Sequence, residues 1–510
     1  MRVPFSLGFR LLTTALLGIL LLGACSSPST AYYVDCENGD DANDGRSPAT
    51  AWRTLERAGQ DTLRAGECLL LRKGQTFHGQ LNVTGIGTED APVLVSGYGD
   101  GPMPVIQGGD STMWALRVRN SQFLTVRALE IVNTGKERLP ARTGLFVECA
   151  DYGVSTGITI DSVYIHDVNG SLIKRQGGGS GIHIVNHGRE VLSRFDRLTI
   201  TNCHIQRCER NAMIWDGNFR RDRWFPNTNV VVRGNLIEQV PGDGIVPIGC
   251  DGTLIEYNVM RDCPDLLPPA QAAAGIWPWS CDNTVIQFNE VSDHKAPSDA
   301  QGYDCDYNCT GTVIRYNYSH DNHGGLVLVC DAGGARKDYS IGNDRSRVEY
   351  NISVGDGIRP RDDRGEMFSP SIHIGGRATN TFIGYNIIHA NPRPDPIDRT
   401  TVCSEAWDGY ADSTTFSHNV FYVADEGGFI MSQSTNNVFT HNWFLGTFKD
   451  RPEDGEGLME SETYKKEVLD VDPTGYKAME QLMDEREICG FTAHFVNEAK
   501  IKAFFEKMEQ

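Results

Sequence analysis

A short phrase of alternating apolar and polar residues recurs through the middle of the chain. It consists of an apolar residue, a polar or small residue, an aromatic or small residue, and then asparagine. Its eight copies end at Asn235, Asn258, Asn289, Asn317, Asn351, Asn386, Asn419 and Asn442, with spacings of 23, 31, 28, 34, 35, 33 and 23 residues. Alternation with a period of two is typical of β-strands, and repeats longer than about 20 residues are typical of solenoids. The pattern therefore predicts stacked coils, with loop insertions in the longer ones.

The repeated asparagine has a structural explanation. Coils stacked about 4.8 Å apart pair each strand with its neighbours. An asparagine at a fixed turn position tolerates left-handed backbone angles and can hydrogen-bond to the backbone. Stacked asparagines can also bond to one another along the axis. We therefore expect an asparagine ladder that stabilises the fold and takes no part in catalysis.

A second repeated segment lies between the asparagines and begins at a glycine or another small residue. Gly244, Gly275, Gly302, Gly325 and Ser371 align as its starts, and Ala406 fits more loosely. Side chains alternate between the two faces of a strand. The first and third residues after each start are mostly apolar and should point inward. The second and fourth should point outward: Val246 and Ile248, Trp277 and Trp279, Asp304 and Asp306, Val327 and Val329, and His373 and Gly375.

The first residues resemble an export signal. Two arginines, Arg2 and Arg10, flank an apolar stretch at residues 11–22 that is too short to span a bilayer comfortably. Leu22-Gly-Ala-Cys25 resembles the lipobox of bacterial lipoproteins. That resemblance implies a signal peptide at residues 1–24, a lipid on Cys25 and a tether at 25–31. It implies a cell-envelope lipoprotein of a Gram-negative-type bacterium, on the periplasmic face more than the cell surface. An ordinary secretory signal is the alternative.

The rest of the chain divides into three parts. Residues 32–84 should form an N-terminal cap and the first coils, with a covering helix from about Thr54 to Arg64. Residues 85–450 should form the solenoid. Residues 451–510 should form a partly helical extension, with helices at Tyr476 to Glu487 and Asn497 to Met508, which caps or leans on the end of the solenoid.

The net charge limits the binding partners that we expect, and the cysteines suggest one disulfide. The formal net charge of −20 argues against a nucleic-acid partner, whose phosphates need a basic surface. It also makes a polyanionic substrate less natural, unless calcium or a basic patch intervenes. The chain has 14 cysteines, of which Cys36 and Cys68 form a candidate disulfide. We expect a monomer that reaches the membrane only through its lipid.

Several segments resemble a known superfamily. The Tyr32-Tyr-Val opening, the Trp52-Arg-Thr-Leu segment and the Asp-rich turn between them are similar to right-handed parallel β-helix proteins of the pectate-lyase-like superfamily. Gly302-Tyr-Asp-Cys-Asp306 and residues 316–325 resemble its carbohydrate-active members. The resemblance covers roughly residues 32–445. It implies an all-β, right-handed parallel β-helix and a glycan substrate. The superfamily includes lyases, hydrolases and epimerases, so the fold alone does not choose between them.

Asp304 and Asp306 are the main catalytic candidates. Two residues apart on one strand face, they should have Cα atoms about 6.5–7 Å apart. Glycoside cleavage needs one protonated and one ionised carboxyl group, and mutual repulsion would raise the pKa of one of them. Asp331, one coil further on, could supply the second carboxylate. The alternatives are a calcium site and a solvated acidic patch. We expect no required cofactor, with Ca²⁺ as the alternative.

Four positions and one insertion are candidates for binding the substrate. Trp277 and Trp279 could stack on sugar rings, or could pack under the loop at residues 263–274. His373 and Asp408 could line a further subsite. The insertion that contains Arg359 and Glu366 could fold over the groove.

Two rival functions remain open. A calcium-dependent polysaccharide lyase would use Arg336 or Lys337 as the base, with Ca²⁺ on Asp304 and Asp306. A non-catalytic glycan-binding solenoid would need aromatic residues spread along the groove. The acidic net charge and the paired tryptophans favour hydrolysis.

Overall fold

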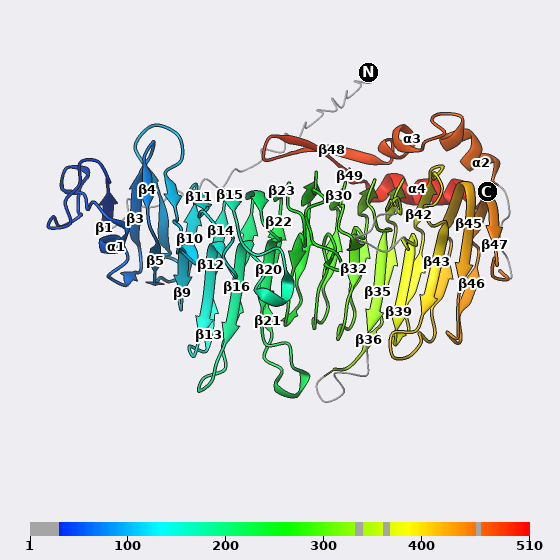
Figure 1. The fold of residues 1–510 in the computed structure, drawn as a ribbon, viewed down its shortest axis with the longest axis horizontal. Helices are drawn as coiled ribbons and strands as arrows, with labels where there is room; N and C mark the ends of the chain where they lie inside the picture. Colours follow the sequence, from blue (N-terminus) through cyan, green and yellow to red (C-terminus); the bar gives the residue numbers. More distant parts are fainter. Residues whose placement is uncertain (1–29, 332–339, 361–367, 455–460) are drawn as a thin grey trace, which may run out of the picture.

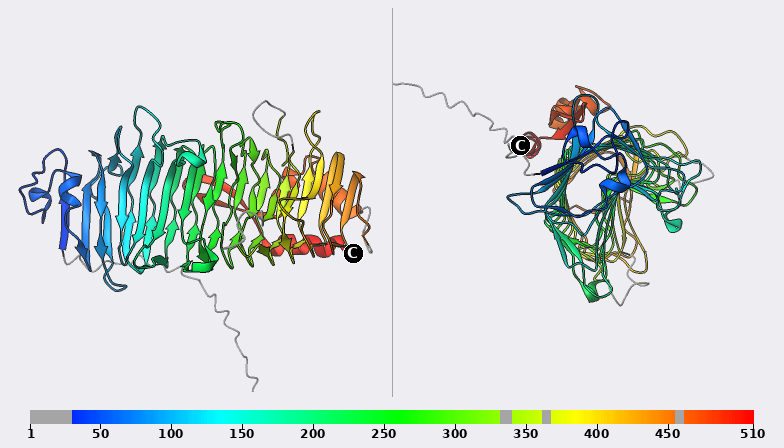
Figure 2. Two further views of the ribbon diagram at one scale, coloured as in Figure 1. Left: turned by 60° about the horizontal axis from the view of Figure 1, so that its bottom comes forward. Right: turned by 90° about the vertical axis from the view of Figure 1, so that its left-hand side faces the viewer.

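The computed structural model describes residues 30–331, 340–360, 368–454 and 461–510. These residues form a right-handed parallel β-helix, elongated along one axis, as the sequence predicts (Figure 1). The view along the axis shows the coils wound around one shared core (Figure 2). Within the described residues, every strand pair of the coils is parallel, and the one antiparallel pair lies in the C-terminal extension.

Three series of strands run the length of the helix. The first series is one sheet of 14 strands. In spatial order it contains β1 (Thr30–Val34), β3 (Glu67–Arg72), β7 (Val93–Tyr98), β10 (Leu124–Arg127), β14 (Ile158–Asp161), β18 (Thr199–Thr201), β22 (Val231–Arg233), β26 (Leu254–Glu256), β29 (Val285–Gln287), β33 (Val313–Arg315), β37 (Arg347–Glu349), β41 (Phe382–Gly384), β44 (Thr415–Ser417) and β46 (Val438–Thr440).

The second series follows the asparagine turns. It contains β4 (Thr76–His78), β8 (Val105–Gln107), β11 (Glu130–Asn133), β15 (Tyr164–Val168), β19 (His204–Cys208), β23 (Leu236–Glu238), β27 (Val259–Arg261), β30 (Glu290–Ser292), β34 (Tyr318–His320), β38 (Ile352–Val354), β42 (Ile387–Ala390), β45 (Val420–Ile430) and β47 (Trp443–Lys449). Its strands pair in that order, each with the next coil.

The third series carries the candidate site. It contains β5 (Leu81–Val83), β9 (Trp114–Arg119), β12 (Thr143–Ala150), β16 (Ser180–His187), β20 (Asn211–Asp216), β24 (Ile245–Val246), β32 (Tyr303–Cys305), β35 (Val327–Asp331), β39 (Ile372–Gly376) and β43 (Thr400–Glu405). Single bridges through Ile276 join β24 to β32, and β45 closes the series because it pairs with β43 as well as β42.

Short strands complete the turns and insertions. They are β2 (Leu63–Arg64), β6 (Gly85–Ile86), β13 (Val154–Thr156), β17 (Arg194–Asp196), β21 (Asn227–Thr228), β25 (Cys250–Asp251), β28 (Ala272–Ala273), β31 (Ser298–Asp299), β36 (Asn343–Asp344) and β40 (Ala378–Thr379). The pair β28–β31 lies outside the regular coils and becomes one wall of the candidate site.

The asparagine ladder is confirmed. Each side-chain amide from Asn235 to Asn419 donates a hydrogen bond of 2.8–3.0 Å to the Oδ1 of the next asparagine along the axis. The last, Asn442, donates to Asp454 at 2.8 Å. All eight side chains are buried. The ladder therefore satisfies buried polar groups, which would otherwise cost free energy.

The expectation that asparagine itself takes the left-handed conformation is wrong. The residue before each asparagine has positive φ: Gly234, Tyr257, Phe288, Tyr316, Tyr350, Tyr385, His418 and His441. Seven of these are aromatic, and neighbours stack with centroids 4.7–5.4 Å apart. Stacking between coils offsets the strain that a bulky side chain meets at positive φ. We call this second column the aromatic stack.

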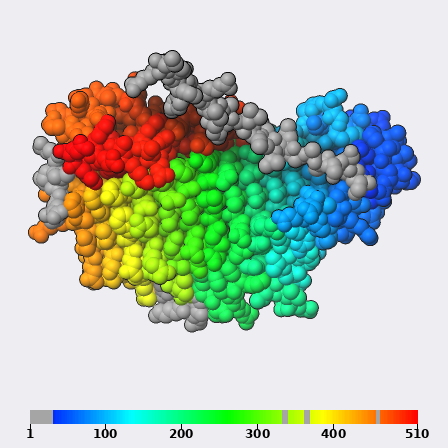
Figure 3. Space-filling view, turned by 180° about the vertical axis from the view of Figure 1, so that it is seen from behind, coloured from blue at the N-terminus to red at the C-terminus, as the bar shows by residue number. Residues whose placement is uncertain are grey.

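The C-terminal extension lies lengthwise along the solenoid and covers the aromatic stack (Figures 1 and 3). It contains α2 (Glu462–Tyr464), a π-helical turn (Lys465–Leu469), α3 (Tyr476–Glu480), the hairpin of β48 (Met483–Ile488) and β49 (Phe491–Val496), and α4 (Glu498–Met508). Phe505 packs against Tyr385, with ring centroids 5.4 Å apart, and Phe495 against Tyr257 at the same distance. The helix at Asn497 to Met508 is confirmed, with Asn497 as its N-cap.

Two expectations about helices need correction. The segment Tyr476 to Glu487 is helical only to Glu480 and then enters β48, which packs on the side of the solenoid rather than its end. The N-terminal helix α1 spans only Leu55–Ala58, because Gly59 ends it and Leu63 joins β2; η1 (Pro48–Thr50) precedes it. Strand β1 begins at Thr30, inside the expected tether.

Two other observations bear on the ends and the cysteines. The described cysteines are all free thiols, so the Cys36–Cys68 disulfide is not formed. Cys36 Sγ instead donates to Gln75 Oε1 at 3.4 Å. No helix within the described residues is long and apolar enough to cross a membrane.

The sequence alignment of the third series is displaced by one residue in β35. Tyr303 pairs with Val327, and Val327 pairs with Ile372. Val327 and Val329 therefore point into the core, where both are fully buried, and Leu328 and Cys330 take the outward positions. The alignment failed here because Gly325 lies one residue earlier in its coil than Gly302 does. A one-residue shift moves every side chain to the opposite face.

Candidate active site

A cavity of about 730 Å³ lies on the outer face of the third series. The strands of four coils form its floor, and insertions form its walls. Five residues predicted from sequence line it: Trp277, Asp304, Asp306, Arg359 and His373. The other lining residues are Lys174, Asp243, Ala272, Ala273, Ala274, Ser298, Asp299, Gln301, Tyr307, Leu328, Cys330, Phe368, Glu405 and Trp407.

Asp304 lies on the floor of this cavity, on β32. Its side chain is only 3% exposed, and its Oδ1 atom has no hydrogen-bond partner among the described residues. Burial raises the pKa of Asp304 well above its ordinary value, and the negative charges of Asp299, Asp306 and Asp243 raise it further. This environment therefore favours the neutral form of the carboxyl group.

Asp306 lies two residues further on and is more accessible. Its Oδ1 accepts hydrogen bonds from the Tyr307 backbone N–H at 2.5 Å and from the Cys330 thiol at 3.2 Å. Burial raises the pKa of Asp306 to about 6, and the two donors oppose that rise because they favour the ionised form. Of the two sequence-predicted carboxyl groups, Asp306 is thus the one set up to be ionised.

Asp299 is a cavity residue that the sequence analysis missed. It ends β31 with a left-handed φ of 62° and is partly exposed. Burial raises the pKa of Asp299, while the nearby charges of Arg359 and Lys174 lower it. It lies in an insertion outside the repeated strands, so the alignment gave no signal for it. The one sign of it in the sequence is its place between Pro297 and Gly302, where the next aligned strand segment begins.

The two tryptophans have different environments. Trp277 lines the cavity and is 6% exposed, and its Nε1–H donates to Asp243 Oδ1 at 3.2 Å. Lys174 Nζ lies 4.8 Å from the centre of the same ring. Trp279 does not line the cavity and packs against Phe219, with ring centroids 4.9 Å apart. Trp279 thus packs on Phe219, which belongs to a different loop from the one at residues 263–274, and Trp277 takes the cavity position.

Asp243 organises one end of the cavity. It is fully buried, and its Oδ2 lies 3.3 Å from Arg210 Nη2 and 3.9 Å from Lys174 Nζ. Its Oδ1 also accepts from the Ala274 backbone N–H at 3.2 Å. A buried carboxylate needs such partners to offset its desolvation. Asp243 thus fixes the Trp277 indole and holds Lys174 at the cavity mouth.

His373, Glu405 and Trp407 form the opposite end. Glu405 Oε1 accepts from Trp407 Nε1 at 2.9 Å and lies 3.0 Å from His373 Nε2. These bonds, the one to His373 first, hold the pKa of Glu405 below its ordinary value. Trp407 lies over Gly375, where a Cβ atom would approach the indole to 2.7 Å. Gly375 in the outward column is what makes room for this ring.

Arg359 is buried in the wall beside Asp299. Its guanidinium donates to the backbone oxygens of Asp299 and Phe368, the latter at 2.9 Å. The described ends of the insertion before β39 therefore line the cavity, and the expectation that the insertion folds over the groove stays a prediction, because residues 361–367 lie outside the described residues. Arg359 binds backbone oxygens of two wall segments there and so links them.

Two further sequence-predicted residues, Asp408 and Asp331, are described and do not line the cavity. Asp408 is exposed in a turn, and Arg377 Nε binds its backbone oxygen at 2.9 Å. The alignment at Ala406 was wrong, because the strand of that coil is β43, which ends at Glu405. Asp331 is buried at the end of β35 and does not line the cavity. Cys25, Arg336, Lys337 and Glu366 lie outside the described residues.

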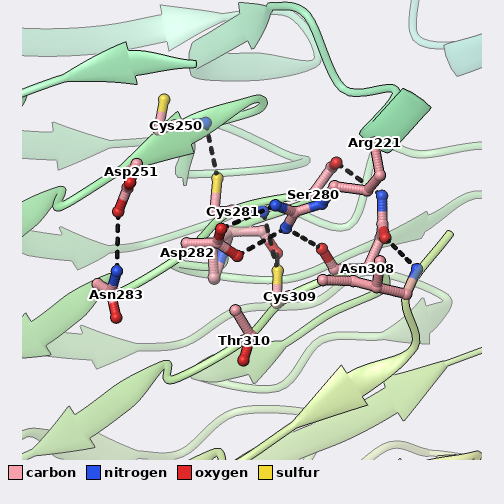
Figure 4. A network of polar contacts seen from close by, with 12 residues as sticks. Arg221, Cys250, Asp251, Ser280, Cys281, Asp282, Asn283, Asn308, Cys309 and Thr310 are labelled. Carbon is pink, nitrogen blue, oxygen red and sulfur yellow. Dashed lines mark hydrogen bonds and ion pairs between the residues drawn. The ribbon is translucent and has the colours of Figure 1, made fainter. Parts of the chain in front are cut away.

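A polar network around Arg221 and Asp282 links neighbouring coils (Figure 4). Arg221, in the loop after β20, reaches across to Asp282 with bonds of 2.9 and 2.8 Å and to the Asn308 backbone oxygen at 2.6 Å. Cys250, Cys281 and Cys309 stack beside it. The backbone nitrogen of Cys250 lies 3.4 Å from the sulfur of Cys281, and that of Cys281 lies 3.4 Å from the sulfur of Cys309. The loop thereby ties three coils together and brings Phe219 onto Trp279.

Comparisons with known proteins agree with the fold. Residues 180–358 match a family model described as a right handed beta helix region. The chain is 27% identical over 426 residues to a lacto-N-biosidase of Bifidobacterium longum subsp. longum, in an alignment that covers 65% of this chain and 26% of that protein. The chain thus matches about a quarter of the length of this curated relative.

Two solved structures are also similar. Both are of a GH136 lacto-N-biosidase from Eubacterium ramulus. The selenomethionine form has a TM-score of 0.56 at 23% identity and covers 76% of this chain and 67% of its own. The native form has a TM-score of 0.55 at 22% identity and covers 79% and 68%. At this identity the likeness concerns the fold. The chain therefore has the right-handed parallel β-helix fold, and the similar proteins described here are named as lacto-N-biosidases.

Proposed function

We propose that the chain is a glycoside hydrolase in which Asp306 is the ionised catalytic carboxylate and a neutral neighbour is the general acid. One observation carries the proposal: a single cavity holds Asp306, which has two hydrogen-bond donors, beside Asp304 and Asp299, whose pKa values are both raised. Hydrolysis of a glycosidic bond needs this pairing of one ionised and one protonated carboxyl group.

Two residues are candidates for the acid. Asp304, the sequence-based choice, is the more strongly held in its neutral form, but it is 3% exposed on the cavity floor. Asp299 also has a raised pKa and is partly exposed in the wall. An acid must approach the leaving oxygen to hydrogen-bond distance. Accessibility therefore favours Asp299 as the acid, with Asp304 as a neutral group beneath the pair.

The walls of the cavity suit a sugar. The Trp277 ring lies at one end and the Trp407 ring at the other, and each indole is oriented by a carboxylate. Aromatic faces stack on the apolar faces of sugar rings, while Lys174 and His373 offer polar contacts to hydroxyl groups. Since the similar proteins are lacto-N-biosidases, we propose glycans that contain lacto-N-biose as the first substrates to test.

Product analysis tests the reaction class. The chain should release new reducing ends from a glycan panel without any increase in ultraviolet absorbance. The rival lyase would produce a conjugated double bond, and therefore absorbing products, from a uronic-acid polymer. Calcium dependence would accompany it, because Asp304 and Asp306 would then hold the ion. Absorbing products that disappear with EDTA and return with calcium would replace hydrolysis by this rival.

A leaving-group comparison identifies the acid. The variant that lacks the general acid should lose activity on natural glycans and keep most of it on aryl glycosides, whose leaving groups need no proton. We expect this behaviour from Asp299→Asn, whereas Asp306→Asn should lose both activities. If Asp304→Asn shows the selective loss and Asp299→Asn does not, the sequence-based assignment is correct. If neither shows it, the acid lies elsewhere in the cavity.

A further inference from the structure

Three different metal-binding side chains meet at one end of the cavity. His373 on β39 pairs directly with Cys403 on β43, and Glu405 follows two residues later on the same face. One ligand atom from each lies within 4.8 Å of the other two. Among the described residues, this is the one set of three such groups that are so close. The three carboxyl groups of the proposed catalytic centre do not form a comparable set.

The thiol of Cys403 has no role in the architecture described so far. It is 2% exposed and is a free thiol, and no hydrogen bond of its sulfur is found within the described residues. Other buried thiols, such as those of Cys281 and Cys309, donate to backbone oxygens of neighbouring coils. Cys403 instead pairs with His373 on the outward face of the series, next to the cavity that His373 and Glu405 line and that Cys403 itself does not line.

We propose that His373, Cys403 and Glu405 form a Zn²⁺ site at the cavity wall. A thiolate, an imidazole and a carboxylate are a ligand set that suits zinc, whereas calcium and magnesium prefer oxygen atoms alone. Tetrahedral zinc places ligand atoms roughly 3.3–3.8 Å apart. His373 Nε2 and Glu405 Oε1 are already 3.0 Å apart, so small side-chain rotations close the set.

The surroundings resemble those of a three-ligand zinc site with an open position. Trp407 Nε1–H donates to Glu405 at 2.9 Å and so orients that carboxylate, as residues that hydrogen-bond to metal ligands do in known sites. The rings of Phe368 and Trp407 pack edge-on against His373, with centroids 5.4 and 5.3 Å away. His373 and Glu405 both line the cavity, so the fourth position faces it.

Zinc binding would release a proton to solvent and block one end of the cavity. Zinc takes Cys403 as the thiolate, and its proton passes to solvent, so affinity should rise with pH. A bound ion would lie at the end of the cavity that His373, Glu405 and Trp407 line. On the proposed function, zinc is therefore an inhibitor that competes with the glycan. Binding itself does not depend on that function.

Cobalt substitution tests the site without reference to activity. Metal-free full-length protein titrated with Co²⁺ should show one ion per chain, a thiolate-to-cobalt charge-transfer band in the near ultraviolet and tetrahedral visible bands that Zn²⁺ bleaches. Cys403→Ser should lose the charge-transfer band and bind the ion at least about 100-fold more weakly. Cys281→Ser is the matched control, because Cys281 is equally buried within a stack of three thiols.

The Co²⁺ spectra of the two variants distinguish a site at Cys403 from one at the cysteine stack. A band that persists in Cys403→Ser and vanishes in Cys281→Ser would place the ion at the cysteine stack and overturn the proposal. So would the absence of any thiolate band in the unaltered protein. Thermal unfolding of both variants confirms that they are folded. Hydrolysis assays then show whether Cys403→Ser keeps its turnover and loses inhibition by Zn²⁺; absence of turnover in every variant would refute the proposed function and leave the binding result standing.

Discussion

At the scale of single residues, the three cavity aspartates differ in their hydrogen bonds. Asp306 accepts two bonds that favour its charged form, Asp304 has an oxygen without a partner among the described residues, and Asp299 lies close to two cations. The same residue type thereby meets environments that favour different protonation states in one cavity. This difference of environment allows one aspartate to act as base or nucleophile and another as acid.

The pH dependence follows from these states. Asp306 must be ionised, and its pKa is about 6, so kcat/KM should fall about tenfold per pH unit below that value. The pKa is raised relative to an ordinary aspartate, and activity is therefore lost as pH falls through about 6 rather than about 4. Burial also raises the pKa values of Asp299 and Asp304, that of Asp304 well above its ordinary value, and so favours a neutral acid beside Asp306. An acid limb near pH 4 would contradict this assignment.

Cys330 offers a test of how Asp306 is tuned. Its thiol donates to Asp306 at 3.2 Å, and burial raises its own pKa, so it remains a donor. Cys330→Ala removes a bond worth about 1 kcal/mol, which should move the acid limb of kcat/KM upward by about 0.7 unit. Cys330→Ser keeps a donor and should restore the limb. If the acid limb of kcat/KM lies at the same pH in both folded variants, the thiol does not influence Asp306.

At the scale of elements, the asparagine ladder makes the most direct stability prediction. Asn317 donates to Asn351 at 3.0 Å and to the Ile286 backbone oxygen at 2.9 Å, and it accepts from Asn289. Asn317→Ala leaves these buried groups unpaired and should lower the free energy of unfolding by about 1–3 kcal/mol. Urea titration measures the loss. Turnover per folded molecule should be unchanged, and its loss with unaltered stability would give the ladder a catalytic role.

The periodic elements could be predicted, and the non-periodic ones could not. Asparagine spacing located the turns from Asn235 to Asn442, because every copy occupies the same position in its coil. The glycine starts were less reliable: Gly325 shifted the predicted register of β35, and Ala406 hid β43 and with it Glu405. A strand start carries a weaker pattern than a buried hydrogen-bonded ladder, since several small residues satisfy it equally well.

The C-terminal extension shows the same limit. The helical spacing of Ile501, Phe504, Phe505 and Met508 predicted α4 correctly, because one apolar face must be buried. The hairpin of β48 and β49 is held by tertiary contacts, including packing of Phe495 on Tyr257. Short charged segments such as Asp484 to Glu487 carry no strand signal of their own, so this hairpin could not be recognised from the sequence.

At the scale of the whole molecule, the cavity is a product of insertions on a regular scaffold. The coils supply Trp277, Asp304, Asp306 and His373, which the repeat pattern could identify. The walls supply Lys174, Asp299 and Arg359, which come from loops of different coils and meet only in three dimensions. Periodicity contains no information on how such loops fold, and this is why Lys174 and Asp299 emerged only from the structure, whereas Arg359 was predicted from the insertion that contains it.

The proposed envelope location also belongs to this scale. Cys25 lies outside the described residues, so its lipidation stays a prediction from the lipobox-like segment. Cys25→Ser should release the protein from the membrane fraction or leave an unprocessed precursor, because multiple acyl chains provide the stable anchor. Fractionation and mass of the intact chain measure both outcomes. A variant that is mature and still fully membrane-bound would refute the lipoprotein prediction.

The most direct test of the central claim is the turnover of Asp306→Asn beside that of Asp408→Asn on a cleaved glycan. Asp306 lines the cavity, whereas Asp408 is an exposed turn residue outside it, so the two changes are chemically identical and differ in place. The account predicts a loss of at least about 100-fold for Asp306→Asn, the range for removal of a catalytic acid or base, with unchanged folding. It predicts near-normal turnover for Asp408→Asn. Full activity in Asp306→Asn would contradict it.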